Sequence, residues 1–129
     1  MIILPWPDNA LSPNSRVHWA VKAKAAKSYR KEAGWLTVTS KDGVDSEGLI
    51  HLKITFLPPS KRKYDLDNLL ARIKSGIDGV ADGFGVDDSR FKYTIEIGKV
   101  VPPGWVRVEV VRSVEQAIAV VEDYMGMKS

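Results

Sequence analysis

The chain has 129 residues, a length typical of one compact domain. Hydrophobic residues make up 44% and charged residues 27%, which is enough apolar material for a core and argues against disorder. There is no cysteine, so disulfides, thiolate nucleophiles and cysteine-bound zinc are excluded. The sequence has no apolar run of membrane-spanning length, and its start lacks the pattern of a signal peptide. We therefore expect a soluble, cytoplasmic protein with no membrane partner.

The formal net charge is only +3, but basic and acidic residues gather in different segments. Between Arg16 and Lys31 there are six basic residues and no acidic one, whereas six of the ten aspartates lie between Asp65 and Asp88. A basic surface holds phosphates and clustered carboxylates hold a cation, so this pattern is typical of metal-dependent chemistry on a polyanion. The alternative is that the basic stripe is only a solvated face.

The first half of the chain predicts a strand over residues 1–4, a loop over 8–16, a helix over 17–38, a turn-rich connection over 39–48 and a strand over 49–57. In the second strand, alternate residues are apolar, so one side is expected to face the core. The first helix is expected to bury an apolar stripe. Its members are Trp19, Ala23, Ala26, Ala33 and Leu36.

The second half predicts a helix over residues 68–83, because Leu69, Ile73, Ile77 and Val80 recur about once per turn. Three glycines weaken this helix. After a loop over 84–89, residues 91–101 and 105–111 alternate like strands around a Pro-Pro-Gly turn, which predicts an antiparallel hairpin.

A last helix is expected over residues 113–125, with Ser113 as its N-cap. The predicted order is β-α-β-α-β-β-α, a single α+β domain with a mixed sheet and helices packed on it. Residues 1–112 would form the main domain, and residues 113–129 a helix appended to it.

Asp65 and Asp67 lie just before the second predicted helix. On extended backbone, residues two apart point to the same side, so both carboxylates can face one cation. Mg²⁺ prefers oxygen ligands, usually one or two carboxylates with waters and phosphate. Asp87 and Asp88 follow the helix, and one of them would complete the site if the helix folds back along the sheet. The alternatives are that Asp65 or Asp67 only caps the helix, or that the basic run 61–63 neutralises the acids.

Three motifs together give the chain a family resemblance. They are LPWP at Leu4–Pro7, a basic run followed by DLDN at Asp65–Asn68, and DDSRF at Asp87–Phe91. In this order and spacing they resemble the RusA family of Holliday-junction resolvases, which are bacterial and phage endonucleases. The resemblance implies a homodimeric α+β protein that acts in DNA recombination and repair. It would cut four-way DNA junctions by paired symmetric nicks with Mg²⁺, for which Mn²⁺ is a substitute.

The resemblance also implies roles for individual residues. Asp65, Asp67 and Asp88 fall on the family's catalytic metal ligands. The family's lysine, four residues after the second aspartate, is replaced here by Ala71. Lys74 lies one turn further along the helix and is our candidate for the displaced catalytic charge.

The expected DNA contacts are basic residues in two groups. They are Lys61, Arg62 and Lys63 before the second helix, and Arg16, Lys24 and Lys27 on and near the first. Two other functions fit the same residues: a branched-DNA-binding module with weak or lost catalysis, and a nuclease that acts on flaps or forks.

The histidines and tryptophans are first interpreted as structural. His51 lies on a strand, and His18 is either an exposed residue at a helix start or a phosphate contact. The tryptophans are expected in the core or at a dimer contact rather than as platforms for bases. They are Trp6, Trp19, Trp35 and Trp105.

Overall fold

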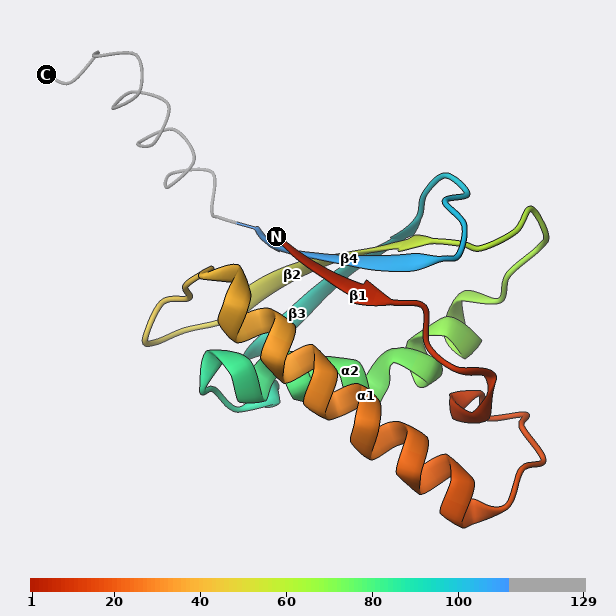
Figure 1. Cartoon of the computed structure of the whole chain (residues 1–129). Coiled ribbons are helices and arrows are strands. Elements are labelled where there is room, and N and C mark those ends of the chain that lie inside the picture. Colours follow the sequence, from red (N-terminus) through yellow and green to blue (C-terminus); the bar gives the residue numbers. More distant parts are fainter. Residues whose placement is uncertain (112–129) are drawn as a thin grey trace, which may run out of the picture.

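A computed structural model describes residues 1–111 as one mixed sheet with two helices packed beneath it (Figure 1). The elements are β1 (Ile2–Pro5), the 3-10 turn η1 (Asn9–Leu11), α1 (Trp19–Ser40), β2 (Ile50–Leu57), α2 (Leu66–Phe84), the 3-10 turn η2 (Asp88–Arg90), β3 (Phe91–Ile97) and β4 (Trp105–Val111). The predicted α+β class and the order of helices and strands are confirmed over this range. The helix expected over 113–125 and the boundary after residue 112 lie outside the described residues.

The strands lie in the order β1-β4-β2-β3. β4 is antiparallel to both β1 and β2, whereas β2 and β3 are parallel. The predicted hairpin of β3 and β4 is therefore wrong, because β2 lies between them. α2 provides the crossover that a parallel pair requires. The chain after β3 then crosses the end of β2, where Gly98 N–H donates to Phe56 O at 2.8 Å and Val101 N–H donates to Pro58 O at 2.9 Å.

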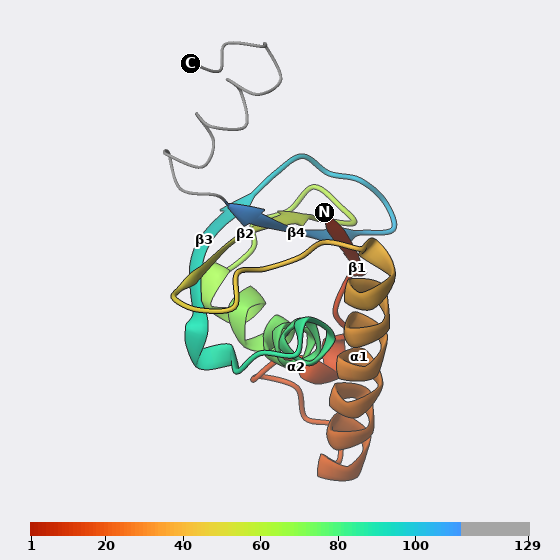
Figure 2. The ribbon, with the colours of Figure 1, turned by 90° about the vertical axis from the view of Figure 1, so that its left-hand side faces the viewer.

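The core lies between the sheet and the two helices, which cover the same face of the sheet (Figure 2). In β2, Leu52, Ile54 and Phe56 are fully buried, as their alternation predicted. The opposite side of β2 is polar, and His51 Nε2 lies 2.5 Å from Thr94 Oγ1 of β3. This contact agrees with the structural interpretation of His51.

Glycines of α2 allow α1 to approach at very close range. They are Gly76, Gly79 and Gly83, and they face Tyr29, Ala33 and Thr37 of α1. A Cβ added at Gly79 would lie 2.1 Å from the carbonyl oxygen of Arg30 and 2.8 Å from the Cβ of Ala33. Residues that lower the helix propensity of α2 are thus required for its packing.

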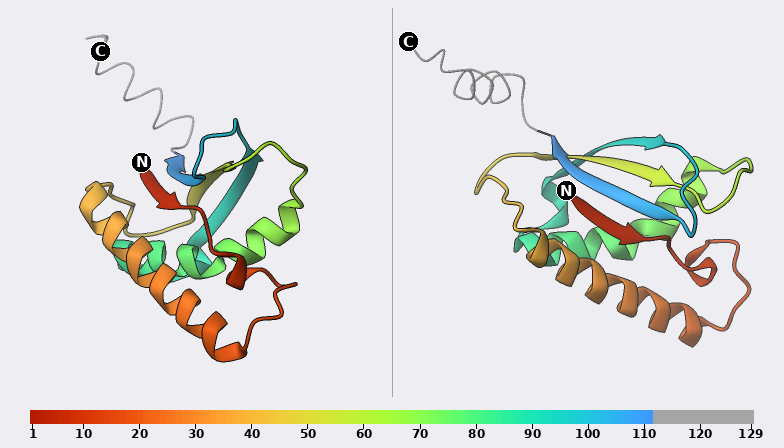
Figure 3. Two further views of the ribbon diagram at one scale, coloured as in Figure 1. Left: turned by 45° about the vertical axis from the view of Figure 1, so that its right-hand side comes forward. Right: turned by 45° about the horizontal axis from the view of Figure 1, so that its top comes forward.

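The apolar stripe predicted for α1 is only partly right. Ala33 is buried and Ala26 and Leu36 are half-buried, but Trp19 and Ala23 are exposed. The first turns of α1 extend away from the sheet (Figure 3). Within residues 1–111, neither helix is both long and apolar enough to cross a membrane.

Candidate functional site

The DLDN motif forms the beginning of α2. Asp65 is the N-cap, and its Oδ1 accepts a hydrogen bond of 3.0 Å from the backbone N–H of Asp67. The capping interpretation is therefore right for Asp65, but the cap uses only one of the two carboxylate oxygens. Asp67 is exposed in the first turn, where the helix dipole favours negative charge. Asn68 Nδ2 donates to Ser12 Oγ at 3.0 Å and so links the motif to the N-terminal loop.

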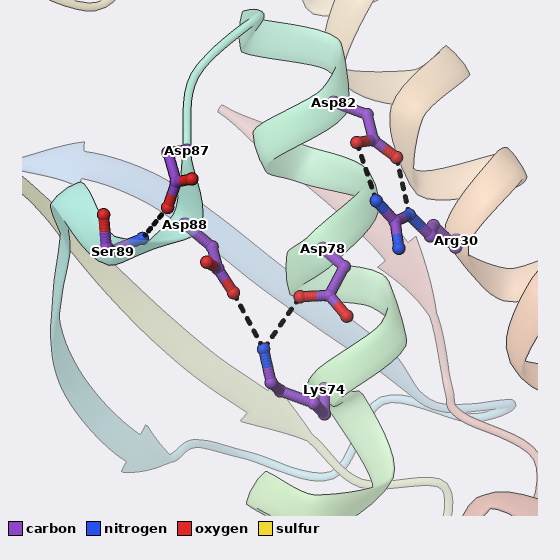
Figure 4. Close-up of polar contacts among 7 residues, drawn as sticks. All are labelled: Arg30, Lys74, Asp78, Asp82, Asp87, Asp88 and Ser89. Carbon is purple, nitrogen blue, oxygen red and sulfur yellow. Dashed lines mark hydrogen bonds and ion pairs between the residues drawn. The ribbon is translucent and has the colours of Figure 1, made fainter.

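The two aspartates after α2 have different surroundings. Asp87 caps η2, and its Oδ1 accepts a hydrogen bond of 2.8 Å from the backbone N–H of Ser89, which lowers the pKa of Asp87. Asp88 faces α2, and its Oδ2 lies 2.9 Å from Lys74 Nζ (Figure 4). Of the pair, Asp88 is thus the carboxylate directed at the helix that DLDN begins.

Lys74 bridges two carboxylates. Its Nζ lies 2.8 Å from Asp78 Oδ1 and 2.9 Å from Asp88 Oδ2. The hydrogen bonds to Asp78 and then to Asp88 raise the pKa of Lys74, so the ammonium is charged at neutral pH. The side chain of Asp78 is 26% exposed, compared with 41% for Asp88 and 62% for Lys74. Sequence reasoning missed Asp78, although its position four residues after Lys74 on a helix is a usable signal.

The predicted aspartate triad does not converge in this structure. Within residues 1–111, no three acidic, histidine or cysteine side chains are arranged to hold a metal ion. Asp67 precedes Lys74 by seven residues, which is about 10 Å along a helix axis. The oxygen ligands of the aspartates suit Mg²⁺, and Asp88 already holds a cation, the ammonium of Lys74. The donors thus fit the metal in kind but not in their arrangement within residues 1–111.

A second ion pair lies one turn further along α2. Arg30 of α1 donates to Asp82 through Nε at 2.7 Å and through Nη2 at 3.0 Å (Figure 4). This bidentate contact lowers the pKa of Asp82 and raises that of Arg30. The guanidinium of Arg30 is therefore engaged with α2, beside the cluster formed by Lys74, Asp78 and Asp88, and joins the two helices there.

The LPWP motif is attached to α2 by Arg72. This side chain is only 5% exposed, and its Nη2 donates to Pro7 O and, at 3.1 Å, to Asn9 Oδ1. The guanidinium carbon lies 5.9 Å from the centre of the Trp6 ring. Desolvation lowers the pKa of Arg72, and Nε has no hydrogen-bond partner within residues 1–111. The N-terminal motif and α2 are thus one packed unit.

The basic run Lys61–Lys63 directly precedes α2 and is exposed. The guanidinium of Arg62 lies over the ring of Tyr64, 4.9 Å from its centre. Within residues 1–111 these three residues form no ion pair with Asp65 or Asp67, in contrast to the salt-bridge alternative. Their charges are available to an external anion.

The second predicted DNA-contact group lies at the beginning of α1. Arg16, Lys24 and Lys27 are exposed and form no ion pair within the described part of the chain. His18 is the N-cap of α1, and its Nδ1 accepts a hydrogen bond of 3.1 Å from the backbone N–H of Ala20. The helix-start interpretation of His18 is therefore supported, and the three basic side chains are oriented to solvent.

The tryptophans differ in their surroundings. Trp6 is half-buried and packs edge-on against Phe56 and Tyr64. Trp105 of β4 is also half-buried. Trp19 and Trp35 are 75% and 67% exposed, so neither lies in the core, and a dimer contact for these two stays a prediction.

Comparison with known proteins adds one relative. No family model matches the chain. A protein of Xylella fastidiosa (strain Temecula1), described as uncharacterized, is 43% identical over 97 residues, which is 70% of this chain and 61% of the relative. The chain thus spans about three-fifths of the length of that relative. The relative's description names no activity.

Proposed function

We propose that this chain is a Mg²⁺-dependent endonuclease that cuts branched DNA, with the four-way junction as its substrate. The observation that carries the proposal is the meeting of three distant motifs at one helix. DLDN begins α2, Arg72 of α2 holds the LPWP segment, and Lys74 of α2 contacts Asp88 of the DDSRF segment. A lysine with a perturbed pKa, together with exposed basic residues near the same helix, supports a functional site there.

The side chains have separate tasks in this proposal. Asp65, Asp67 and Asp88 would hold Mg²⁺, with Mn²⁺ as a substitute. When bound, the ion would supply an activated water and stabilise charge on the scissile phosphate. Lys74, whose pKa is raised, would present a permanent positive charge to the phosphate oxygens.

Phosphates outside the cutting point would be held by exposed basic residues that precede α2 and by others at the beginning of α1. The first group is Lys61, Arg62 and Lys63, and the second is Arg16, Lys24 and Lys27. A homodimer would present two such sites to a junction of near two-fold symmetry, so that paired nicks can be made.

The test is cleavage of a synthetic four-way junction in Mg²⁺, with Asp65 changed in two ways. Asp65→Asn keeps a good N-cap but removes the carboxylate, whereas Asp65→Ala removes both and costs about 1 kcal/mol of stability. If Asp65 binds metal, Asp65→Asn unfolds like the unaltered protein in urea but cleaves at least about a hundredfold more slowly, as expected for loss of a group on a catalytic metal. If Asp65→Asn cleaves at the rate of the unaltered protein, Asp65 caps α2 and does not bind the metal.

Asp67→Asn and Asp88→Asn extend the same assay to the rest of the triad. We expect paired nicks from the unaltered protein and none from either variant. A protein that does not cut junctions, forks or flaps in Mg²⁺ or Mn²⁺ would contradict the proposal. Faster cutting of forks or flaps than of junctions would identify a flap or fork nuclease instead.

A branched-DNA-binding module with weak catalysis is the second candidate. It is favoured by the separation of Asp67 from Asp88 in this structure and by Ala71, which stands where the RusA-like pattern has lysine. Such a module would bind junctions as tightly after Asp67→Asn as before, and it would not nick them.

A further inference from the structure

We propose that two copies of this chain associate through β3, whose strands pair antiparallel with Thr94 opposite Thr94 and join the two sheets into one. β3 lies at an edge of the sheet, and within residues 1–111 it pairs with β2 alone (Figure 2). The inference rests on the homodimer of the proposed function and gives that homodimer an interface. It requires no catalysis, so the interface and the nuclease activity are tested separately.

The free edge of β3 is open to a further strand. Its seven residues, Phe91–Ile97, pair with β2 in an unbroken register and include neither proline nor glycine. Natural sheets usually protect an edge with a short strand, a proline, a bulge or a charged side chain. The other edge strand, β1, has four residues and ends at Pro5, so it is protected. β3 instead carries two charges of opposite sign, those of Lys92 and Glu96.

The sequence of β3 is complementary to itself in the proposed register. With Thr94 on the two-fold axis, Lys92 of each copy lies opposite Glu96 of the other copy. Both side chains point away from the helices, because Phe91 belongs to the core and neighbouring residues of a strand point to opposite faces. Opposite charges directly across an antiparallel pair stabilise it, and the two-fold axis provides this contact twice.

The two charged side chains are accessible to a second copy. Lys92 is exposed and forms no ion pair within residues 1–111. Glu96 is also exposed, and its Oε1 lies 3.3 Å from Lys53 Nζ and 3.2 Å from Thr55 Oγ1. A carboxylate accepts several hydrogen bonds, so Glu96 can contact a second lysine as well.

The face of β3 that points toward the helices offers apolar surface. Tyr93 and Ile97 are 41% and 43% exposed, although they lie on the same face as the buried Phe91. In the proposed register, Tyr93 lies opposite Ile95 of the second copy, and Phe91 lies opposite Ile97. Pairing therefore covers apolar side chains on one face and matches charges on the other. A shift by one residue would bring Lys92 opposite an isoleucine, so the register is specific.

The interface also sets the relative position of the two candidate sites. A two-fold axis perpendicular to the sheet keeps the helices of both copies on the same side of the joined sheet. Lys74 lies on α2, and Asp88 lies in η2, directly before β3. Both copies of the Lys74–Asp88 pair are then on one side of the dimer, as paired cuts in one junction require.

Charge reversal tests the interface in the full chain by sedimentation velocity over a range of concentrations. Lys92→Glu and Glu96→Lys each place like charges opposite each other at two positions, so each should raise the dimer Kd at least about tenfold. An equimolar mixture of the two variants should regain the unaltered affinity, because a dimer with one copy of each restores both opposite-charge pairs. The control is Lys31→Glu at an exposed position of α1, which should change Kd less than about twofold. Urea unfolding of every variant checks the fold.

A cysteine tests the register, because the chain has none of its own. Thr94→Cys places two thiols across the two-fold axis, where the Cβ atoms of opposite residues come close to disulfide distance. Mild oxidation should therefore give a covalent dimer. Thr39→Cys, at an exposed position of α1, should stay monomeric under the same conditions.

Weaker association of both charge variants, recovery in their mixture and a covalent dimer of Thr94→Cys support the inference. It is overturned if the unaltered chain stays monomeric up to about 0.1 mM, if either charge variant dimerises like the unaltered chain, if the mixture does not recover, or if Thr94→Cys does not cross-link. Junction cleavage by a chain that fails these tests overturns the interface alone. Pairing through β3 without cleavage of any branched DNA overturns the nuclease proposal alone.

Discussion

Replacement of Gly79 by alanine tests how the helices hold the site. The added Cβ would lie 2.1 Å from the carbonyl oxygen of Arg30 and 2.8 Å from the Cβ of Ala33. Since both contacts involve the backbone or the first side-chain atom of α1, no rotamer change relieves them and the helices must separate. Overpacking of this kind costs about 1–3 kcal/mol, and alanine's better helix propensity returns at most about 1 kcal/mol.

We expect Gly79→Ala to lower the free energy of unfolding by about 2 kcal/mol and Tm by roughly 8 °C. Urea unfolding followed by circular dichroism measures the first quantity, and a thermal scan measures the second. Gly43→Ala is the control, because its added Cβ has nothing within 4 Å and its φ is not positive. A loss below about 0.5 kcal/mol for Gly79→Ala, which is within the range of neutral surface changes, would refute the packing argument.

Three further predictions concern the charged residues. Arg72→Met should lower the free energy of unfolding by about 1–3 kcal/mol, because it removes charged hydrogen bonds to the N-terminal loop. It should also speed amide hydrogen exchange in η1, and unchanged exchange would contradict the anchoring role of Arg72. Asp82→Asn should lower the free energy of unfolding by at most about 1 kcal/mol at pH 7. Because Arg30 lowers the pKa of Asp82, the difference in stability between the variant and the unaltered protein should persist above about pH 4. It should disappear as the pH falls through the lowered pKa of Asp82. A difference in stability that is the same at all pH values would contradict this prediction. Lys27→Ala should reduce the slope of log K against log salt for junction binding by about 1. The comparison is Lys99→Ala, which changes an exposed lysine between β3 and β4. An equal slope in both variants would exclude a phosphate contact by Lys27.

Local sequence patterns predict the features that depend on neighbours along the chain. The spacing of Leu69, Ile73 and Ile77 predicts the buried face of α2, and all three are buried. Asp65 as a helix cap also depends only on the following residues. These features are predictable because helix periodicity and capping are local properties.

The pairing of strands in the sheet is harder to predict from local sequence patterns. Alternation in residues 91–97 and 105–111 identifies two strands but contains no information on which strand each one contacts. A Pro-Pro-Gly turn between them suggested a hairpin, yet Gly98 and Val101 bond to the end of β2 and carry the chain across it. The choice is made by α2, whose packing places β3 on the far side of β2.

The sequence predicts several residues of the candidate site but not the contacts between them. The family resemblance points to Asp88 rather than Asp87, and to Lys74 as a source of charge. The structure places the side chains of Asp88 and Lys74 together. Asp78 was missed because an aspartate four residues after a lysine is common on exposed helices. The glycines of α2 were interpreted only through helix propensity, because their role depends on α1, a distant segment of the chain.

A crystal of the protein soaked in Mn²⁺ tests the central claim most directly. Our account predicts an anomalous peak about 2.2 Å from carboxylate oxygens of Asp88 and of Asp65 or Asp67, within the usual range of metal–oxygen distances. No peak, or a peak elsewhere, would contradict the claim that these aspartates form the metal site.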